Sequence, residues 1–216
     1  MTGRRFSIAA GVALASLAFV ATVAGAKDLK PTSFGAVYSM EVEIDQIPSM
    51  KSCAVAGPIT IKDQRTETAV GERWHEDTPS LKQTVAMTGD VAAWVREGFG
   101  QIARQSMLQT GTAGKPEVVV SVARIWVQET VYRNAEYDGR VVLDVSVNSP
   151  AGASCWSGRV EGFAENYGRA GKEINYQETV NHALDRTIAT MFGTTGFVDA
   201  LCTCGAHSVE TRPALP

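Results

Sequence analysis

The chain has 216 residues, of which 44% are hydrophobic and 20% charged, and its formal net charge is −3. These values lie near the averages of globular proteins, so they exclude wholesale disorder, a collagen-like repeat and a polytopic membrane protein. The small acidic excess leaves no basic surplus for neutralising phosphates, so we expect no nucleic acid among the partners. The length suits one large domain with a tail.

The first 26 residues have the pattern of a bacterial secretory signal. Arg4 and Arg5 precede an uncharged run rich in Ala, Val and Leu, and the run closes on Ala24-Gly25-Ala26. A basic start, an apolar core and small side chains at the cut predict that residues 1–26 are a cleaved signal peptide. We then expect an exported protein, soluble in the periplasm of the cell envelope. An uncleaved anchor is the alternative, because the run is nearly long enough to span a bilayer.

Behind this segment the sequence predicts a single domain with short unstructured ends. Residues 27–35 show no hydrophobic period and are predicted to be a flexible leader. Residues 36–204 hold the periodic segments and are predicted to form one α+β domain, followed by a disordered tail over residues 205–216. None of the cysteines lies near the cut, where a lipid-modified cysteine would have to become the first residue.

Four cysteines in an exported chain predict two disulfide bonds. Pairing Cys53 with Cys155 would close a loop of about 100 residues and leave Cys202 and Cys204 to form a small, strained ring. Alternatively, Cys53 and Cys155 each pair with one of the tail cysteines. A metal site is the other reading, because Cys202, Cys204 and His207 supply three soft ligands that Zn or Cu could use.

Two strands are predicted before the first helix. Apolar residues alternate with polar ones over residues 38–44 and again over residues 53–61, where the second strand runs into Asp63. From Gly71 to Gly89 the chain is polar and interrupted by proline, which predicts a long loop.

This predicted loop contains His75, Glu76 and Asp77. A histidine beside two carboxylates can transfer protons or bind a metal ion. Neighbours along a loop usually point into water, however. A hydrolase built on these residues therefore requires that their side chains converge with another polar group in a pocket.

Two helices are predicted from apolar residues at helical spacing. The first carries Val91, Val95, Phe99 and Ile102, with Trp94 broadening the stripe, and the second carries Val180, Leu184, Ile188 and Met191. The first helix is expected to be capped by Thr88 or Asp90 and to end at Gly111. The second is expected to be capped by Asn175, paired with Glu178, and to end at Gly193.

Three strands are predicted between the helices. Residues 117–131 are rich in β-branched residues and carry apolar side chains on both faces, which predicts a central strand. Residues 140–147 and 155–167 predict two more strands. A hairpin turn at Asp138-Gly139 would place apolar residues opposite polar ones, so we expect a wider loop from Tyr132 to Gly139.

The order β-β-α-β-β-β-α predicts an α+β fold, with an antiparallel-rich sheet of about five strands and two main helices on one face. Gly158 and Gly162 share one face of the last strand. Their missing side chains would let a helix or a neighbouring Trp pack closely against the strand backbone.

Several features occur in a familiar order: the export leader, Asp63-x-Arg65 at a strand end, Gly71, and then the alternation of helices and strands. Over residues 36–201 the chain resembles the YajG-type family of bacterial envelope lipoproteins and, more distantly, the auxiliary lipoproteins of ABC-type transport systems. The resemblance implies a non-catalytic envelope protein that assists outer-membrane maintenance or transport of lipidic cargo. The chain departs from the family by lacking the lipid-modified cysteine.

Asp63 and Arg65 also have a physical reading that is independent of any family. Two positions apart on a strand, their side chains share one face. They are predicted to pair with each other or to hold the following loop through backbone hydrogen bonds.

The sequence contains no common catalytic motif: no nucleophile elbow, phosphate-binding loop, zinc-protease helix or redox C-x-x-C pair. We therefore expect a non-enzymatic accessory protein without a cofactor. It is predicted to bind an envelope protein or a lipidic ligand through the helix-free face or an edge of its sheet, peripheral to a membrane. The alternatives are a periplasmic metal-binding protein using the C-terminal Cys/His cluster and the hydrolase described above.

Overall fold

The computed structural model describes residues 29–39, 47–57 and 59–204. In this part of the chain, seven strands form one sheet and three helices pack on it. The strands are β1 (Thr32–Gly35), β2 (Thr60–Asp63), β3 (Ala69–His75), β4 (Gln83–Thr88), β5 (Glu117–Val131), β6 (Ala135–Asn148) and β7 (Ser154–Gly168). The helices are α1 (Val91–Gln105), α2 (Glu173–Gly193) and α3 (Thr195–Thr203). The predicted signal peptide and C-terminal tail lie outside the described residues.

The sheet is open and mixed, with the order β1-β4-β3-β5-β6-β7 and with β2 beside β5. One edge of β5 pairs in parallel with β2 at residues 119–122 and with β3 at residues 127–131, and its other edge pairs antiparallel with β6. The α+β class is therefore as predicted. The described sheet has seven strands rather than about five, and its pairings are parallel as often as antiparallel.

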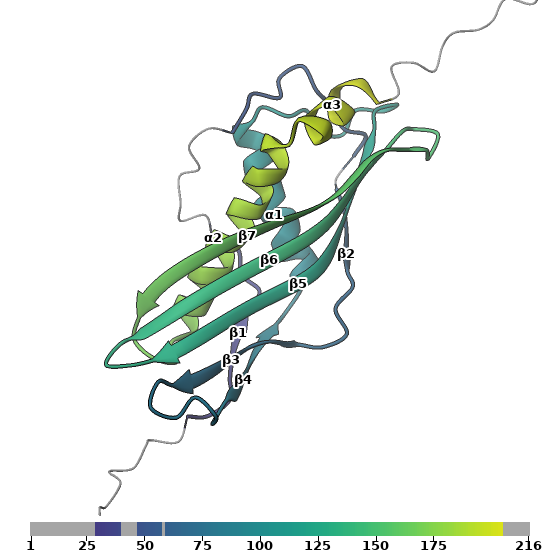
Figure 1. Ribbon diagram of the computed structural model, residues 1–216. Helices are drawn as coiled ribbons and strands as arrows, with labels where there is room; N and C mark the ends of the chain where they lie inside the picture. Colours follow the sequence, from purple (N-terminus) through teal and green to yellow (C-terminus); the bar gives the residue numbers. More distant parts are fainter. Residues whose placement is uncertain (1–28, 40–46, 58, 205–216) are drawn as a thin grey trace, which may run out of the picture.

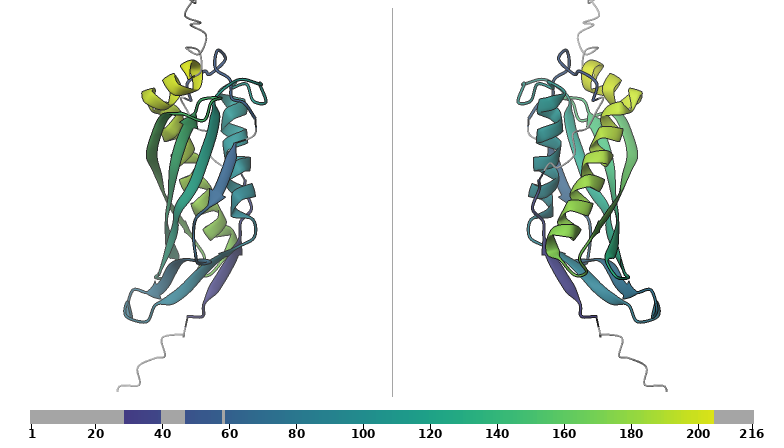
Figure 2. Two further views of the ribbon diagram at one scale, coloured as in Figure 1. Left: turned by 90° about the vertical axis from the view of Figure 1, so that its right-hand side faces the viewer. Right: turned by 90° about the vertical axis from the view of Figure 1, so that its left-hand side faces the viewer.

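The helices cover one face of the sheet, and the opposite face is turned toward the viewer in Figure 1 (Figures 1 and 2). This arrangement follows from the strands, because buried residues alternate with less buried ones along most of β5, β6 and β7. The apolar stripes predicted for α1 and α2 are confirmed as buried. None of the described helices has the length and apolar character needed to cross a bilayer.

Two glycines of β7 allow close packing, as the sequence predicted. A Cβ atom at Gly162 would lie 2.4 Å from the carbonyl oxygen of Ala183 and 2.5 Å from the amide nitrogen of Thr187, both in α2. A Cβ atom at Gly158 would lie 2.6 Å from the ring of Trp156. Helix α2 therefore lies closer to β7 than any side chain at position 162 would permit.

The prediction of a long loop over residues 71–89 is wrong, because most of this segment is a hairpin of β3 and β4. The buried positions of the two strands are few. Val85 and Met87 fill them in β4, whereas β3 buries Val70 and also Arg73, which is only 7% exposed. A buried arginine in a short strand hides the alternation of apolar residues on which the prediction rests.

The N-terminal elements also differ from the prediction. Residues expected to be a flexible leader form β1, because Phe34 is buried in the core and stacks on Tyr176. The strand predicted over residues 38–44 falls mainly outside the described residues. The strand predicted over residues 53–61 is reduced to an isolated bridge at Ala54 followed by β2.

The connection between β5 and β6 is a tight turn at residues 132–134, not the wider loop predicted to extend to Gly139. Asp138 and Gly139 form no turn, as expected, since both residues lie inside β6. A Cβ atom at Gly139 would lie 2.7 Å from the Thr179 methyl group of α2. This glycine therefore serves the close approach of a helix rather than a turn.

The helix ends are confirmed only in part. Asp90 caps α1 by accepting a hydrogen bond from the Ala93 amide, 2.8 Å long. The helix ends at Gln105, ahead of the predicted stop at Gly111. Helix α2 ends at Gly193 as predicted, but it begins after Lys172, so the predicted cap Asn175 lies inside the helix. The Asn175 side chain instead donates to a backbone carbonyl oxygen in the connection from β7.

Candidate functional site

The face of β5, β6 and β7 turned away from the three helices is called the helix-free face (Figure 1). Alternate residues of each strand, those between the buried ones, lie on it. In the strand register, Trp126 of β5 lies beside Arg140 of β6, and Arg140 lies beside Phe163 of β7. The Arg140 guanidinium lies 5.0 Å from the centroid of the Phe163 ring and pairs with Glu161. Phe163 is nevertheless 53% exposed. An aromatic ring is thus available on a face that no described helix covers.

Carboxylates gather further along the same face. One row across β5, β6 and β7 consists of Gln128, Asp138 and Glu165, and a following row consists of Thr130, Glu136 and Tyr167. Burial and the charges of Glu136 and Glu165 raise the pKa of Asp138. Tyr167 is 66% exposed and donates a hydrogen bond to Glu136, 3.2 Å long. We call Glu136, Asp138, Glu165 and Tyr167 the acidic patch.

The charge of the acidic patch also affects its tyrosine. The charge of Glu136, above all, raises the pKa of Tyr167, and Glu165 and Asp138 act in the same direction. None of the ion pairs among the described residues involves the three carboxylates. Three other cations near this face have partners of their own: Arg159 pairs with Asp144, Lys82 with Glu72 and Trp74, and Arg124 lies over Trp126.

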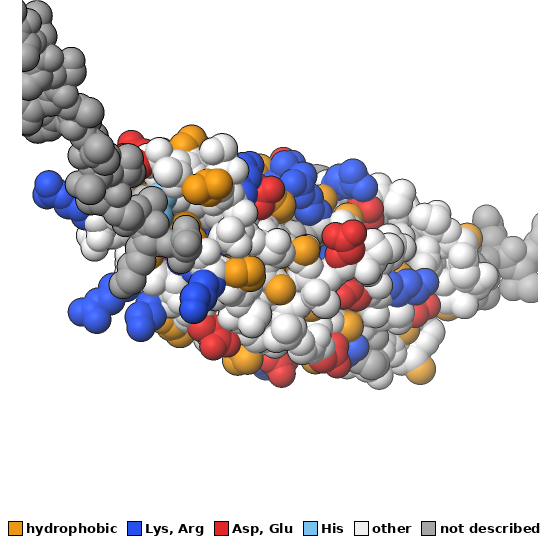
Figure 3. Space-filling model, turned by 90° about the horizontal axis from the view of Figure 1, so that it is seen from below, with side chains coloured by type: hydrophobic (Ala, Val, Ile, Leu, Met, Phe, Trp, Pro, Cys, Tyr) orange, Lys and Arg blue, Asp and Glu red, His pale blue; other side chains and the backbone are white. Residues whose placement is uncertain are grey.

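A cavity of about 620 Å³ opens at the end of the sheet, beside the acidic patch. The structure brings His75, Glu76 and Asp77 to this cavity, together with the β5–β6 turn, Glu136 and Tyr167. Among the described residues, no side-chain hydrogen bond joins His75 to either carboxylate, and no group of three or more His, Cys, Asp and Glu residues is placed to hold a metal ion. Seen from below, the surface carries basic and acidic side chains interspersed with scattered hydrophobic ones (Figure 3).

A buried ion pair fixes this end of the sheet from the helical side. Glu129 of β5 is fully buried, and its carboxylate lies 2.7 Å from Nε of Arg73 in β3. The hydroxyl of Tyr176 and the amide of Gly171, at 2.6 Å, donate to the same carboxylate, and the hydroxyl of Tyr137 lies 3.1 Å from it. The network therefore joins β3, β5, β6 and α2 behind the acidic patch.

Burial raises the pKa values of three tyrosines on the helical side. For Tyr137 burial, followed by the charge of Glu129, raises the pKa to about 12, and Tyr176 shifts in the same direction from burial and its hydrogen bond to Glu129. The pKa of Tyr38 is also raised by burial and by its 2.7 Å hydrogen bond to Asp185. These hydroxyls consequently keep their protons at neutral pH and stabilise the fold as donors.

Asp63, Arg65 and Gly71 have structural roles and do not gather into one site. Nε and Nη2 of Arg65 donate to the two carboxylate oxygens of Asp63 at 2.9 and 2.8 Å, and the Arg65 amide donates to the same carboxylate. These hydrogen bonds lower the pKa of Asp63. A Cβ atom at Gly71 would lie 1.6 Å from the carbonyl oxygen of Val127, so the glycine permits β3 to lie against β5.

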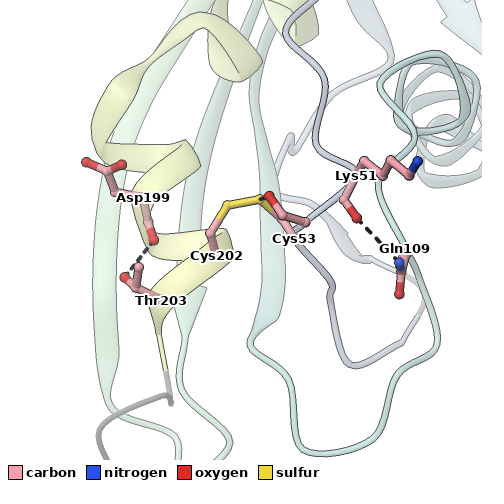
Figure 4. The surroundings of a disulfide bond; sticks show 7 residues. Lys51, Cys53, Gln109, Asp199, Cys202 and Thr203 are labelled. Carbon is pink, nitrogen blue, oxygen red and sulfur yellow. Dashed lines mark hydrogen bonds between the residues drawn. A yellow bond between two sulfur atoms is a disulfide. The ribbon is translucent and has the colours of Figure 1, made fainter.

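The four cysteines form two disulfides that hold α3. Cys53 is bonded to Cys202 (Figure 4), and Cys155 is bonded to Cys204. Each tail cysteine thus pairs with a distant one, as in one of the pairings that the sequence leaves open. The bonded sulfurs are not available as thiolate ligands, and His207 of the metal hypothesis lies outside the described residues.

Sequence reasoning did not find the acidic patch, because Glu136 and Asp138 fall in the segment assigned to a loop. A signal was nevertheless present in β7. The strand repeats a Glu-x-aromatic pattern four residues apart, as Glu161-Gly162-Phe163 and Glu165-Asn166-Tyr167. This spacing places the two glutamates and the two aromatic rings on one face of the strand.

No protein-family model and no curated protein matches the chain. Among solved structures it is similar to a Xanthomonas campestris protein of the DUF330 family, with 8% identity, a TM-score of 0.49, and coverage of 77% of this chain and 96% of that one. It is also similar to a minor lipoprotein from Acinetobacter baumannii, with 8% identity, a TM-score of 0.32, and coverage of 71% and 93%. Membership of the YajG-type family stays a prediction.

Proposed function

We propose that the chain is an exported, non-enzymatic accessory protein of the cell envelope that binds a partner on the helix-free face of its sheet. The observation that carries the proposal is the face of β5, β6 and β7 that none of the described helices covers, on which Phe163 and Tyr167 are more than half exposed. Exposed aromatic rings among polar groups are typical of protein contact surfaces.

Export is supported by two independent features of the chain. The pattern of residues 1–26 is that of a secretory signal. The two disulfides fit an oxidising compartment, since they close over sequence separations of 149 and 49 residues and are not the adjacent pairs of a redox motif.

The non-enzymatic part of the proposal rests on the cavity at the sheet end. General acid-base catalysis needs a base within hydrogen-bond reach of its partner. His75, Glu76 and Asp77 line the cavity, but Glu76 and Asp77 are exposed to solvent. Exposed carboxylates of this kind suit the rim of a contact surface better than a reaction centre.

Site-specific photocrosslinking in cells tests the proposed face. A photoreactive residue at Phe163 should give a discrete adduct, whereas one at Ile174 of α2, with a matched exposure of 52% against 53%, should give none. Adducts at Ile174 alone would place the partner on the helical side.

N-terminal sequencing of the periplasmic protein tests export. The sequence should begin at Lys27, and recovery of a cytosolic chain that begins at Met1 would contradict export.

A further inference from the structure

The helix-free face contains two similar arrangements, of which only one is complete. At Glu161 and Phe163, Arg140 of the neighbouring strand lies over the ring and pairs with the carboxylate. At Glu165 and Tyr167, the corresponding position of the neighbouring strand holds Glu136. The second arrangement therefore has an acid where the first has its cation.

No cation among the described residues forms an ion pair with this second arrangement. Arg133 lines the adjacent cavity with Glu136 and Tyr167, but it takes part in none of the ion pairs. Asp138 adds a third carboxylate, and its raised pKa is the result of the two neighbouring charges together with burial. The negative charge is thus concentrated beside an exposed ring, and no ion pair within the described part of the chain compensates it.

We propose that the acidic patch binds an arginine- or lysine-bearing segment of a protein partner, which supplies the missing cation. An incoming guanidinium on the Tyr167 ring would reach Glu165 and Glu136, repeating the contacts that Arg140 makes with Phe163 and Glu161. Charge complementarity selects this partner over an anionic membrane surface, which the three carboxylates would repel. The inference rests on the proposed function, because it assigns a chemical class to the partner of the same face.

Binding of defined peptides tests this inference. The mature, disulfide-bonded protein is titrated into a labelled short peptide that alternates Arg with Ser, and into one that alternates Glu with Ser, and fluorescence anisotropy is measured. We expect binding of the Arg peptide only, weakened by salt. The double variant Asp138→Asn/Glu165→Gln should raise the dissociation constant about tenfold, and Tyr167→Leu should raise it several-fold by removing the ring.

The matched control is Glu97→Gln/Asp199→Asn, which removes the same two charges from exposed positions on α1 and α3. Its dissociation constant should stay near that of the parent. Equal weakening in both double variants would show attraction to net charge alone and would overturn the proposal.

Other occupants of the face are further outcomes of the same design. Binding to phosphatidylglycerol vesicles in place of the Arg peptide would assign the face to a membrane. A concentration-dependent dimer that is lost in Asp138→Asn/Glu165→Gln would assign the face to a second copy of the chain. Either result would overturn the proposal. If the Phe163 crosslink persists in cells while the Arg peptide does not bind, the cationic partner is wrong and the proposed face stands. Loss of the crosslink removes the proposed function as well.

Discussion

Glu129 carries its charge at a position without exposed surface, and Arg73 opposite is nearly as buried. Removing one partner of such a pair leaves the other charge buried and uncompensated, which costs about 3 to 5 kcal/mol. We therefore expect Glu129→Gln to lower the free energy of unfolding in urea by about 3 kcal/mol. Asp144→Asn breaks an exposed pair with Arg159 and is expected to leave the free energy of unfolding nearly unchanged. Equal effects of the two variants would mean that the buried network contributes no more than a surface pair.

Asp138 and Asp63 are expected to affect stability in opposite directions with pH. The folded pKa of Asp138 is raised, so its ionised form disfavours the folded state, and this penalty develops as pH rises above the unfolded value of about 4. The folded pKa of Asp63 is lowered, so its contribution is present above the unfolded pKa and is lost as pH falls through the folded pKa.

Melting temperatures measured across this pH range test the pair. Asp138→Asn should raise the melting temperature at pH 7 and lose this advantage near and below pH 4, because Asn mimics the protonated acid. Asp63→Asn should lower the melting temperature at pH 7, with the difference vanishing in acid. A lower melting temperature of Asp138→Asn at pH 7 would contradict the view that this carboxylate is kept at a cost in stability for binding.

At the scale of elements, the contact of α2 with β7 depends on a missing side chain. Gly162→Ala would place a methyl group within 2.5 Å of backbone atoms of α2, which cannot move aside as a flexible side chain would. We expect a loss of about 3 kcal/mol in the free energy of unfolding, as for an overpacked core. The control is Gly193→Ala at the end of the same helix, where a Cβ atom meets nothing within 4 Å and the stability should hold or rise slightly. A Gly162→Ala protein as stable as the parent would mean that α2 shifts without cost.

How far the sequence predicts the elements depends on how their buried residues are spaced. Helices α1 and α2 repeat apolar residues at helical spacing, and β5 is a long run rich in β-branched residues, so the sequence identifies these elements readily. Strands β1 and β3 have few buried positions, and β3 fills one of them with Arg73, whose ion-pair partner lies 56 positions along the chain on β5. A local pattern cannot reveal compensation that comes from a distant strand.

The same limit applies to the acidic patch. Gly139 is a glycine because Thr179 of α2 passes over it, and from sequence alone it indicates a turn. That interpretation shortened the predicted strand and moved Glu136 and Asp138 into a loop, where acidic residues are ordinary. The patch becomes recognisable only when β6 is paired residue by residue with β7.

At the scale of the whole molecule, the two disulfides tie the C-terminal helix to two separate parts of the fold. Cys202 joins α3 to the segment before β2 (Figure 4), and Cys204 joins its end to the start of β7. The ring of Phe197 in α3 also packs edge-on against Trp156 of β7. The C-terminal helix is therefore held by bonds and packing at once.

Removing each disulfide separately shows which tether stabilises the fold more. In the loop-entropy model, the Cys53–Cys202 bond, with a separation of 149 residues, stabilises the folded state by about 5 kcal/mol. The Cys155–Cys204 bond, with a separation of 49 residues, stabilises it by about 4 kcal/mol. Cys53 is also buried, at 3% exposure, whereas Cys155 is exposed. We expect Cys53→Ala/Cys202→Ala to lower the urea midpoint more than Cys155→Ala/Cys204→Ala, because it loses the longer loop constraint and core packing together. Since either remaining bond still holds α3, the two losses should not add in the variant without cysteines. The reverse order of midpoints would show that anchoring α3 to β7 matters more than closing the long loop.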